Sequence, residues 1–181
     1  DNDCNGGVDE GFMTDNDFVG TDTIWHKAAN WSLGMVPIAC HNVGIGLGGS
    51  LQTVHFPGSG GQGGGSESSN TFNTIHIGPD GSLVLNPFVY VTILGGHLWN
   101  EGILHAKGSL FMQSVMATTG NGLVNEGVMT IDSQAYIQVQ NIIGIGIYNK
   151  NIILNNGDLS ATSYTHKPLG IIGIRNEGII S

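Results

Sequence analysis

The first eleven residues carry oxygen-bearing side chains at closely spaced positions. In the segment DNDCNGGVDEG, Asp1, Asp3 and Asn5 alternate, a glycine turn follows, and Asp9 and Glu10 come next. Carboxylate and amide oxygens in such an arrangement suit a hard cation, because Ca²⁺ binds oxygen ligands at about 2.3–2.6 Å. We therefore predict a calcium site formed by Asp1, Asp3, Asn5, Asp9 and Glu10.

This acidic segment is not an EF-hand, since Phe12 stands where the EF-hand loop needs its bidentate glutamate. It resembles the cysteine-containing metal-binding repeat of large secreted bacterial proteins, written C-D-G-x-D-N-D-C-D-G-x-x-D-E-G. Ten of the eleven residues match that pattern, and the first cysteine of the pattern would precede Asp1. The resemblance implies a secreted or cell-surface protein and a longer parent polypeptide. The alternative is an acidic linker that binds no metal.

Two cysteines are present, Cys4 and Cys40. In an exported protein they could form a disulfide with each other, which would tie the acidic segment to the rest of the chain. Alternatively, Cys4 pairs with the upstream cysteine that the resemblance implies. We favour the bond between Cys4 and Cys40.

Other polar residues do not assemble into a known catalytic pattern. Asp80, Asp132 and Asp158 fall at different places of the repeat described below, so they do not converge as the carboxylates of a glycosidase would. His76, His97 and His105 offer metal-binding nitrogen, but His105 falls on another face, and we expect ordinary surface histidines. We therefore do not expect an enzyme, and a polysaccharide-degrading enzyme remains an alternative.

Four segments of the chain are versions of one another: LWNEGIL at 98–104, LVNEGVM at 123–129, IYNKNII at 147–153 and IRNEGII at 174–180. Their asparagines follow one another at intervals of 25, 24 and 27 residues. A repeat of this length is typical of a solenoid, in which each unit buries its apolar face by stacking on its neighbours.

The repeats divide into short strands with alternating apolar and polar residues, separated by turn-forming pairs such as Lys107-Gly108. Counting from each asparagine, and from Pro79 for an earlier unit, predicts two inward rows in the last strand of each repeat. One comprises Val89, Leu110, Ala135 and Leu159, and the other comprises Val91, Met112, Ile137 and Ala161. We predict an all-β fold, a right-handed parallel β-helix of about four to five coils with three short strands per coil.

The recurrent asparagines are expected to stack. Equivalent residues of successive coils lie about 4.8 Å apart, so each side chain could donate to one neighbouring coil and accept from the other. We predict such a ladder, and we expect positive φ at the glycines two residues beyond each repeat start; these two sets are Asn100, Asn125, Asn149 and Asn176, and Gly81, Gly102, Gly127 and Gly178. Lys150 interrupts an acidic row of Glu101, Glu126 and Glu177, which should reduce like-charge repulsion.

Aromatic residues recur on the opposite face of the last strand. The same counting places Tyr90, Phe111 and Tyr136 in one outward row, which continues at Ser160. Three aligned aromatic side chains would form a contact surface.

Residues 24–46 contain Trp25, Asn30-Trp31, Gly34, Val36-Pro37 and Asn42-Val43. This arrangement resembles the module W-x(4)-N-W-s-x-G-x-v-P-x(4)-d-x-V-x-I that opens many secreted and autotransporter-like bacterial β-solenoids. The resemblance implies that the two tryptophans cover the first coil; sugar stacking is the alternative. We expect four regions: an acidic segment (1–23), a capping coil (24–57), a flexible Gly/Ser loop (58–70) and β-helix repeats (71–181).

The net charge is −9, and residues 1–24 contribute seven acids and no base. The single arginine and the lack of a basic stripe argue against nucleic-acid binding, and no apolar run is long enough to span a membrane. We predict a structural or adhesive segment of a bacterial extracellular or cell-surface fibre that self-associates or continues into further coils, with glycans as further partners. A glycan-binding module is the other alternative.

Overall fold

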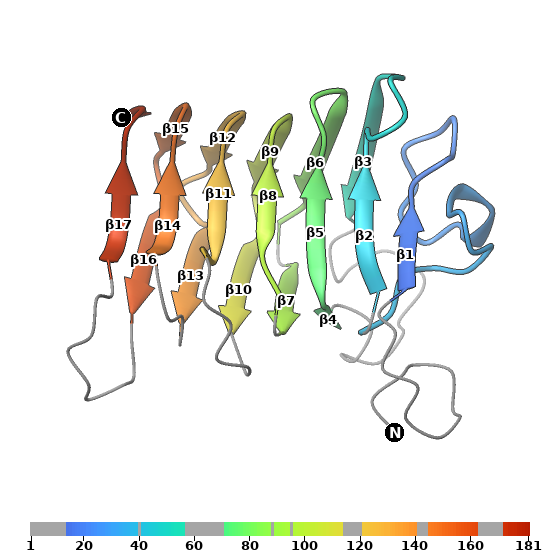
Figure 1. Ribbon diagram of the computed structural model, residues 1–181, viewed down its shortest axis with the longest axis horizontal. Coiled ribbons are helices and arrows are strands. Elements are labelled where there is room, and N and C mark those ends of the chain that lie inside the picture. Colours follow the sequence, from blue (N-terminus) through green and yellow to red (C-terminus); the bar gives the residue numbers. More distant parts are fainter. Residues whose placement is uncertain are drawn as a thin grey trace.

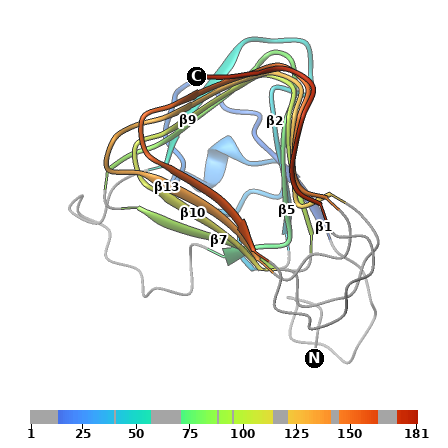
Figure 2. The same ribbon diagram turned by 90° about the vertical axis from the view of Figure 1, so that its left-hand side faces the viewer.

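A computed structural model covers the chain and describes residues 14–39, 41–56, 71–87, 89–94, 96–113, 121–140, 145–162 and 172–181. It is a parallel β-solenoid in which five complete coils each contribute one strand to each of three sheets (Figure 1). Viewed along the solenoid, the sheets form the sides of a triangle (Figure 2). The all-β parallel solenoid with three strands per coil, predicted from the repeats, is confirmed.

All the paired strands of the three sheets run parallel. The first sheet has the order β1 (Thr14–Asp17), β2 (His41–Ile45), β5 (Thr74–Ile77), β8 (Leu98–Asn100), β11 (Leu123–Asn125), β14 (Ile145–Asn149) and β17 (Ile172–Asn176). The second has the order β3 (Gln52–Phe56), β6 (Gly81–Leu85), β9 (Ile103–Ala106), β12 (Val128–Ile131), β15 (Ile152–Asn155) and β18 (Ile179–Ile180). The third comprises β4 (Thr71–Phe72), β7 (Tyr90–Leu94), β10 (Ser109–Gln113), β13 (Tyr136–Gln140) and β16 (Asp158–Thr162).

Helical structure in the described part of the chain is limited to one 3₁₀ turn, η1 (Ala28–Asn30). No helix there is long and apolar enough to cross a membrane.

The interior is a stack of apolar rows, because alternate residues of each strand point inward. One row of the first sheet shows the pattern: Ile75 pairs with Leu98, Leu98 with Leu123, and Leu123 with Ile147. All four are essentially fully buried. Burial of this kind contributes about 25 cal/mol per Å² of apolar surface, which makes these rows the main source of stability.

The asparagine side chains are joined from coil to coil inside the first corner. Nδ2 of Asn100 donates to Oδ1 of Asn125 at 2.7 Å, and the next two links measure 2.8 and 2.7 Å. Each Nδ2 also donates to a carbonyl oxygen at the start of the second sheet in the following coil, at Val128, Ile152 or Ile179. The ladder therefore fixes the corner between the first and second sheets.

The ladder begins at Asn100, because Ile77 occupies the equivalent position in the preceding coil. Oδ1 of Asn100 is buried and has no hydrogen-bond donor. The first-sheet alignment that started the earlier unit at Pro79 is thus wrong by two residues. Gly78, Pro79 and Asp80 make this corner longer, and the expected register returns in the second sheet, where Leu83 pairs with Leu104.

The expectation of positive φ after the asparagines is also wrong. Among the described glycines, positive φ occurs at Gly34, Gly46 and Gly49. The repeat glycines are required instead by close contact between coils: a Cβ on Gly127 would lie 2.1 Å from the carbonyl oxygen of Gly102. Asn151 occupies this position in one coil, where the bond from Ile152 N to Gly127 O lengthens to 3.4 Å, against 2.8 Å for Val128 N to Gly102 O.

The register predicted for the third sheet is wrong by two residues in alternate coils. Leu110 pairs with Val91 and Ile137, and Ile137 pairs with Leu159. The turns before β7 and β13 are two residues longer than those before β10 and β16, and they bury Val89 and Ala135 in the corner. Two extra residues preserve the alternation of faces, so the pattern did not reveal them.

The N-terminal end of the solenoid is covered by an aromatic cluster. Trp25 and Trp31 are buried, and the ring centroid of Trp25 lies 4.8 Å from Trp31, 4.5 Å from Phe56 and 5.3 Å from Phe72. Nε1 of Trp31 donates to the Trp25 carbonyl oxygen at 2.7 Å. Figure 2 shows the η1 turn within the triangular outline. Burial of both indoles leaves neither free to stack on a sugar.

A strand of the first sheet precedes the capping region expected at 24–57. β1 pairs with β2 along its whole length, so Thr14–Asp17 forms the first strand of the first sheet. The flexible loop expected at 58–70 lies outside the described residues.

Candidate functional site

The interior of the solenoid is filled by apolar rows and asparagines, so its functional groups lie on the outer faces of the three sheets. On the first sheet, the imidazole of His76 stacks on the indole of Trp99 in the next coil, with ring centroids 4.7 Å apart and an interplanar angle of 5°. Nε2 of His76 lies 2.7 Å from a carboxylate oxygen of Glu101. The pair is held by the sheet register, in which His76 and Trp99 are direct neighbours.

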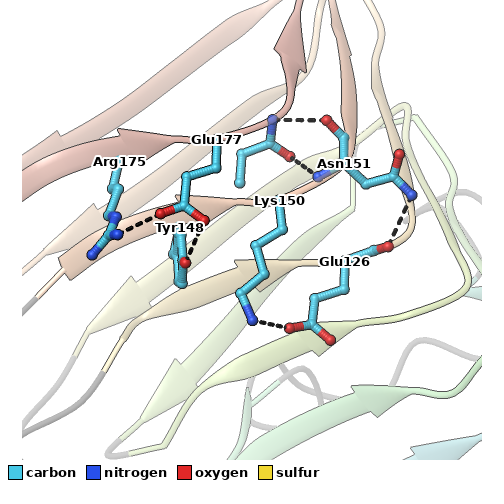
Figure 3. A network of polar contacts seen from close by, with 7 residues as sticks. Glu126, Tyr148, Lys150, Asn151, Arg175 and Glu177 are labelled. Carbon is cyan, nitrogen blue, oxygen red and sulfur yellow. Dashed lines mark hydrogen bonds and ion pairs between the residues drawn. The ribbon is translucent and has the colours of Figure 1, made fainter.

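A charged network continues on the same face toward the C-terminus (Figure 3). The hydroxyl of Tyr148 donates to Oε2 of Glu177 at 2.7 Å, and Arg175 binds the other oxygen of this carboxylate. The Arg175 guanidinium and the Lys150 ammonium lie 5.0 and 5.1 Å from the centroid of the Tyr148 ring. Lys150 also pairs with Glu126, as its place in the acidic row suggested.

The electrostatics of this network stabilise the neutral form of Tyr148 and the charged form of Glu177. The hydrogen bond to Glu177, followed by burial and the Glu177 charge, raises the pKa of Tyr148 above its ordinary value. The hydrogen bond from Tyr148, with that from Arg175, lowers the pKa of Glu177. At neutral pH the phenol is protonated and the carboxylate is ionised, so Tyr148 donates to a charged acceptor.

The aromatic residues of the third sheet gather into a cluster rather than a single row. In the observed register Tyr90 lies opposite Ser109, and Phe111 lies between Thr92 and Gln138. The ring of Tyr90 nevertheless lies 6.1 Å from that of Phe111 and 6.5 Å from that of Tyr136. The predicted single row is thus wrong in register, but its three aromatic residues meet, and Tyr90 is 45% exposed.

Burial, the charge of Tyr136 and a hydrogen bond with Tyr136 raise the pKa of Tyr90. Its hydroxyl is therefore a neutral donor and acceptor at physiological pH. Thr92, Gln138 and Ser160 lie in the same row of the sheet as Phe111. Aromatic carbon and uncharged hydrogen-bonding groups are thus combined on the third-sheet face.

Two of the histidines expected to be ordinary surface residues, His76 and His105, lie beside carboxylates on two different sheets. His76 faces Glu101 on the first sheet, and His105 lies 3.0 Å from Asp132 on the second. Among the described residues, no group of three or more His, Cys, Asp and Glu side chains is placed to hold a metal ion. The predicted calcium ligands Asp1, Asp3, Asn5, Asp9 and Glu10, and the predicted Cys4–Cys40 bond, lie outside the described residues and stay predictions.

Sequence reasoning missed a row of aliphatic residues on the outer face of the second sheet. In this outer apolar row each residue pairs with the next, and it comprises Ile103, Val128, Ile152 and Ile179. The signal was present, because an Ile or Val follows every repeat asparagine by three residues. The contacts of the aromatic residues directly before two of the asparagines were also missed. Trp99 stacks on His76, and Tyr148 contacts Lys150 and Arg175.

Comparisons with protein-family models, with curated proteins and with solved structures found no match.

Proposed function

We propose that this chain is a structural and adhesive segment of an extracellular or bacterial cell-surface fibre, in which it associates with copies of itself. The observation that carries the proposal is the aromatic cluster of Tyr90, Phe111 and Tyr136 on the outside of a regular parallel solenoid. Exposed aromatic surface is costly in water and typical of contact sites.

The architecture supports a mechanical role. Each coil is hydrogen bonded to its neighbours through three sheets, and the asparagine ladder adds a fourth line of bonds inside the first corner. Bending the solenoid would require these bonds and the apolar rows to separate together. Such a rod holds surface residues at fixed intervals along its length, which is what a fibre or an adhesin requires.

Immunogold electron microscopy of the producing cells, with antibodies raised against this chain, tests the proposal. We expect gold particles along fibres or on the outer cell surface. Labelling confined to the cytoplasm would contradict both the fibre role and the extracellular location.

A glycan-binding module is the second candidate, and the third-sheet face favours it. Its aromatic cluster lies beside the hydroxyl and amide side chains of Thr92, Gln138 and Ser160, the mixture that recognises neutral sugars. On a glycan array, the wild-type chain should bind a set of neutral glycans and Phe111→Ala should lose that binding. Val124→Ala, on the first sheet, is the matched control. Equal binding by Phe111→Ala would exclude this face.

The calcium site belongs to the same proposal. If residues 1–11 bind Ca²⁺, chelation should increase proteolysis of this segment and leave the melting of the coils unchanged, because the described core packs without it. Limited proteolysis with and without chelator measures this. Identical cleavage in both conditions would remove calcium from the proposed function.

A further inference from the structure

The outer face of the second sheet carries no ionisable group other than histidine at its strand positions. The six strands β3, β6, β9, β12, β15 and β18 contain no Asp, Glu, Lys or Arg. Ile103, the first residue of the outer apolar row, is 50% exposed although it lies on an inner strand and is flanked by Ser82 and Val128. Leu154, in the adjacent row, is 41% exposed. Exposed aliphatic side chains on a face without Asp, Glu, Lys or Arg are typical of a contact surface.

The charges lie at the two corners that border this face. Glu101, Glu126 and Lys150 follow the first sheet at one corner, and Lys107 and Asp132 follow the second sheet at the other. An uncharged apolar centre with a polar rim is the usual composition of a protein–protein interface.

We propose that two copies of this chain pack against each other through the outer face of the second sheet. The inference rests on the self-association proposed above and adds a second contact surface to it, a pairwise one distinct from the aromatic cluster of the third sheet. The spacing of the rows points to a second copy: side-chain rows recur about every 4.8 Å along the solenoid, so the ridges of one copy fit the grooves of another over the whole length of the face. A partner of different architecture would match these rows at only one or two points.

Repulsion between the net charges of two copies also favours contact through this face. Each copy carries a net charge of −9, so approach through surfaces that bear carboxylates is opposed by like charge. Among the described strands, β1 of the first sheet contains Asp15 and Asp17, and β16 of the third contains Asp158. The second sheet is the face on which the described strands bring no like charges together.

The size of the face predicts a weak dimer. Six strands spaced about 4.8 Å apart, with about 3.3 Å per residue along each strand, give a face of about 24 Å by about 15 Å. This area is below the standard interface of about 800 Å² per partner, so we expect concentration-dependent association. Because the same face is used by both copies, the contact is isologous and closes at two copies.

Sedimentation velocity of the chain from about 10 µM to about 1 mM tests the inference. The wild-type chain should convert from one to two copies, and Ile103→Glu should weaken this association by about tenfold or more, because it places an unpaired charge at the centre of the interface. Val124→Glu, on the outer face of the first sheet, adds the same charge and should associate like the wild type. Circular dichroism checks that each variant is folded, and Leu154→Glu supplies the same test if Ile103→Glu does not fold.

The outcomes separate this inference from the proposed function. A wild-type chain that remains monomeric throughout would overturn both the self-association and this interface. Association that is unchanged in Ile103→Glu and Leu154→Glu would overturn only the assignment to the second sheet. Growth beyond two copies that survives both substitutions would overturn the closed dimer.

Discussion

At the scale of single residues, Asn125 shows how a buried amide can be fully used. It accepts from Asn100, and its Nδ2 group donates to Asn149 and to the carbonyl oxygens of Gly127 and Ile152. A buried polar group stabilises a fold only when its partners are all present. The stacked coils supply those partners by repetition, which explains why the same residue recurs at the same corner.

Asn125→Ala should therefore destabilise the chain strongly. The substitution removes the bonds with Asn100 and Asn149 and the donations to the carbonyl oxygens of Gly127 and Ile152, and each buried group that loses its partner costs about 1–3 kcal/mol. We expect the free energy of unfolding to fall by about 2–4 kcal/mol in denaturant titrations. Asn156→Ala, at an exposed turn, is the control and should change it by less than about 0.5 kcal/mol. Equal losses at the two positions would contradict the stabilising role of the ladder.

His41 makes the cap sensitive to pH. The side chain is 4% exposed, and its Nδ1 lies 3.1 Å from Nδ2 of Asn16 and 3.4 Å from the backbone nitrogen of Ile38, so Nδ1 accepts from both donors and the ring is neutral. Burial lowers the pKa of His41 below its ordinary value of 6.5. Below pH 6.5 His41 binds a proton in the unfolded chain but not in the folded chain. The free energy of unfolding therefore falls until the pH reaches the pKa of His41 in the folded chain.

His41→Gln keeps an acceptor at this position and removes the titration. We expect the wild-type chain to lose more stability than His41→Gln between pH 7 and pH 5, in denaturant titrations at both values. The comparison isolates His41, because burial also lowers the pKa values of His26 and His97 in both proteins. The same pH dependence in wild type and variant would show that His41 is not responsible.

At the scale of the structural elements, the distance between coils depends on the glycines of the first corner. A side chain at position 127 would overlap the carbonyl oxygen of Gly102, which belongs to a hydrogen-bonded turn and cannot move alone. The lengthened bond beside Asn151 shows the local adjustment that a larger residue requires. The corner thus accepts a larger residue only when the neighbouring coils separate locally.

Gly127→Ala should separate neighbouring coils and lower the free energy of unfolding by about 1–3 kcal/mol, the usual cost of overpacking. Gly48→Ala is a matched control, since no atom lies within 4 Å of the added Cβ and its φ is not positive. The control should be neutral or slightly stabilising, because alanine restricts the unfolded chain. Thermal unfolding of both variants measures the difference, and a neutral Gly127→Ala would show that the coils can separate without cost.

At the scale of the whole molecule, each coil contacts only its neighbours along the solenoid. Stability is then a sum of coil and interface contributions, and a local defect weakens nearby coils more than distant ones. The aromatic cap and the ladder lie at different positions along the axis, with Trp25 packed on the first coil and the asparagines beginning at Asn100.

Trp25→Ala should therefore produce a graded effect. Loss of the buried indole removes its contacts with Trp31, Phe56 and Phe72 and should cost about 3–5 kcal/mol. Hydrogen exchange measured by mass spectrometry should show the largest loss of protection in β2, β3 and β5, and the smallest in β13 and β15. Uniform loss along the chain would indicate a single cooperative unit instead.

The sequence by itself determined the architecture. The repeated asparagine segments predicted the length of one coil, the alternation of apolar and polar residues predicted two faces per strand, and the turn-forming pairs predicted three strands per coil. Each of these patterns is local, and a solenoid repeats it in every coil. The side chains of the asparagine ladder could also be named, because a polar residue that recurs in every coil must meet its own copies.

Only the tertiary structure decided the register between strands and explained why glycine is required at the repeat corners. The turns before β7 and β13 each contain two extra residues, which leave the alternation of faces intact. Val89 and Ala135 therefore lie in corners, and Leu110 pairs with Ile137 instead of Ala135, the partner predicted from the sequence. The repeat glycines are small because of a carbonyl oxygen in the next coil, and the aromatic residues of the third sheet meet diagonally rather than in a row. These features depend on distances between coils, and local pattern carries no information about such distances.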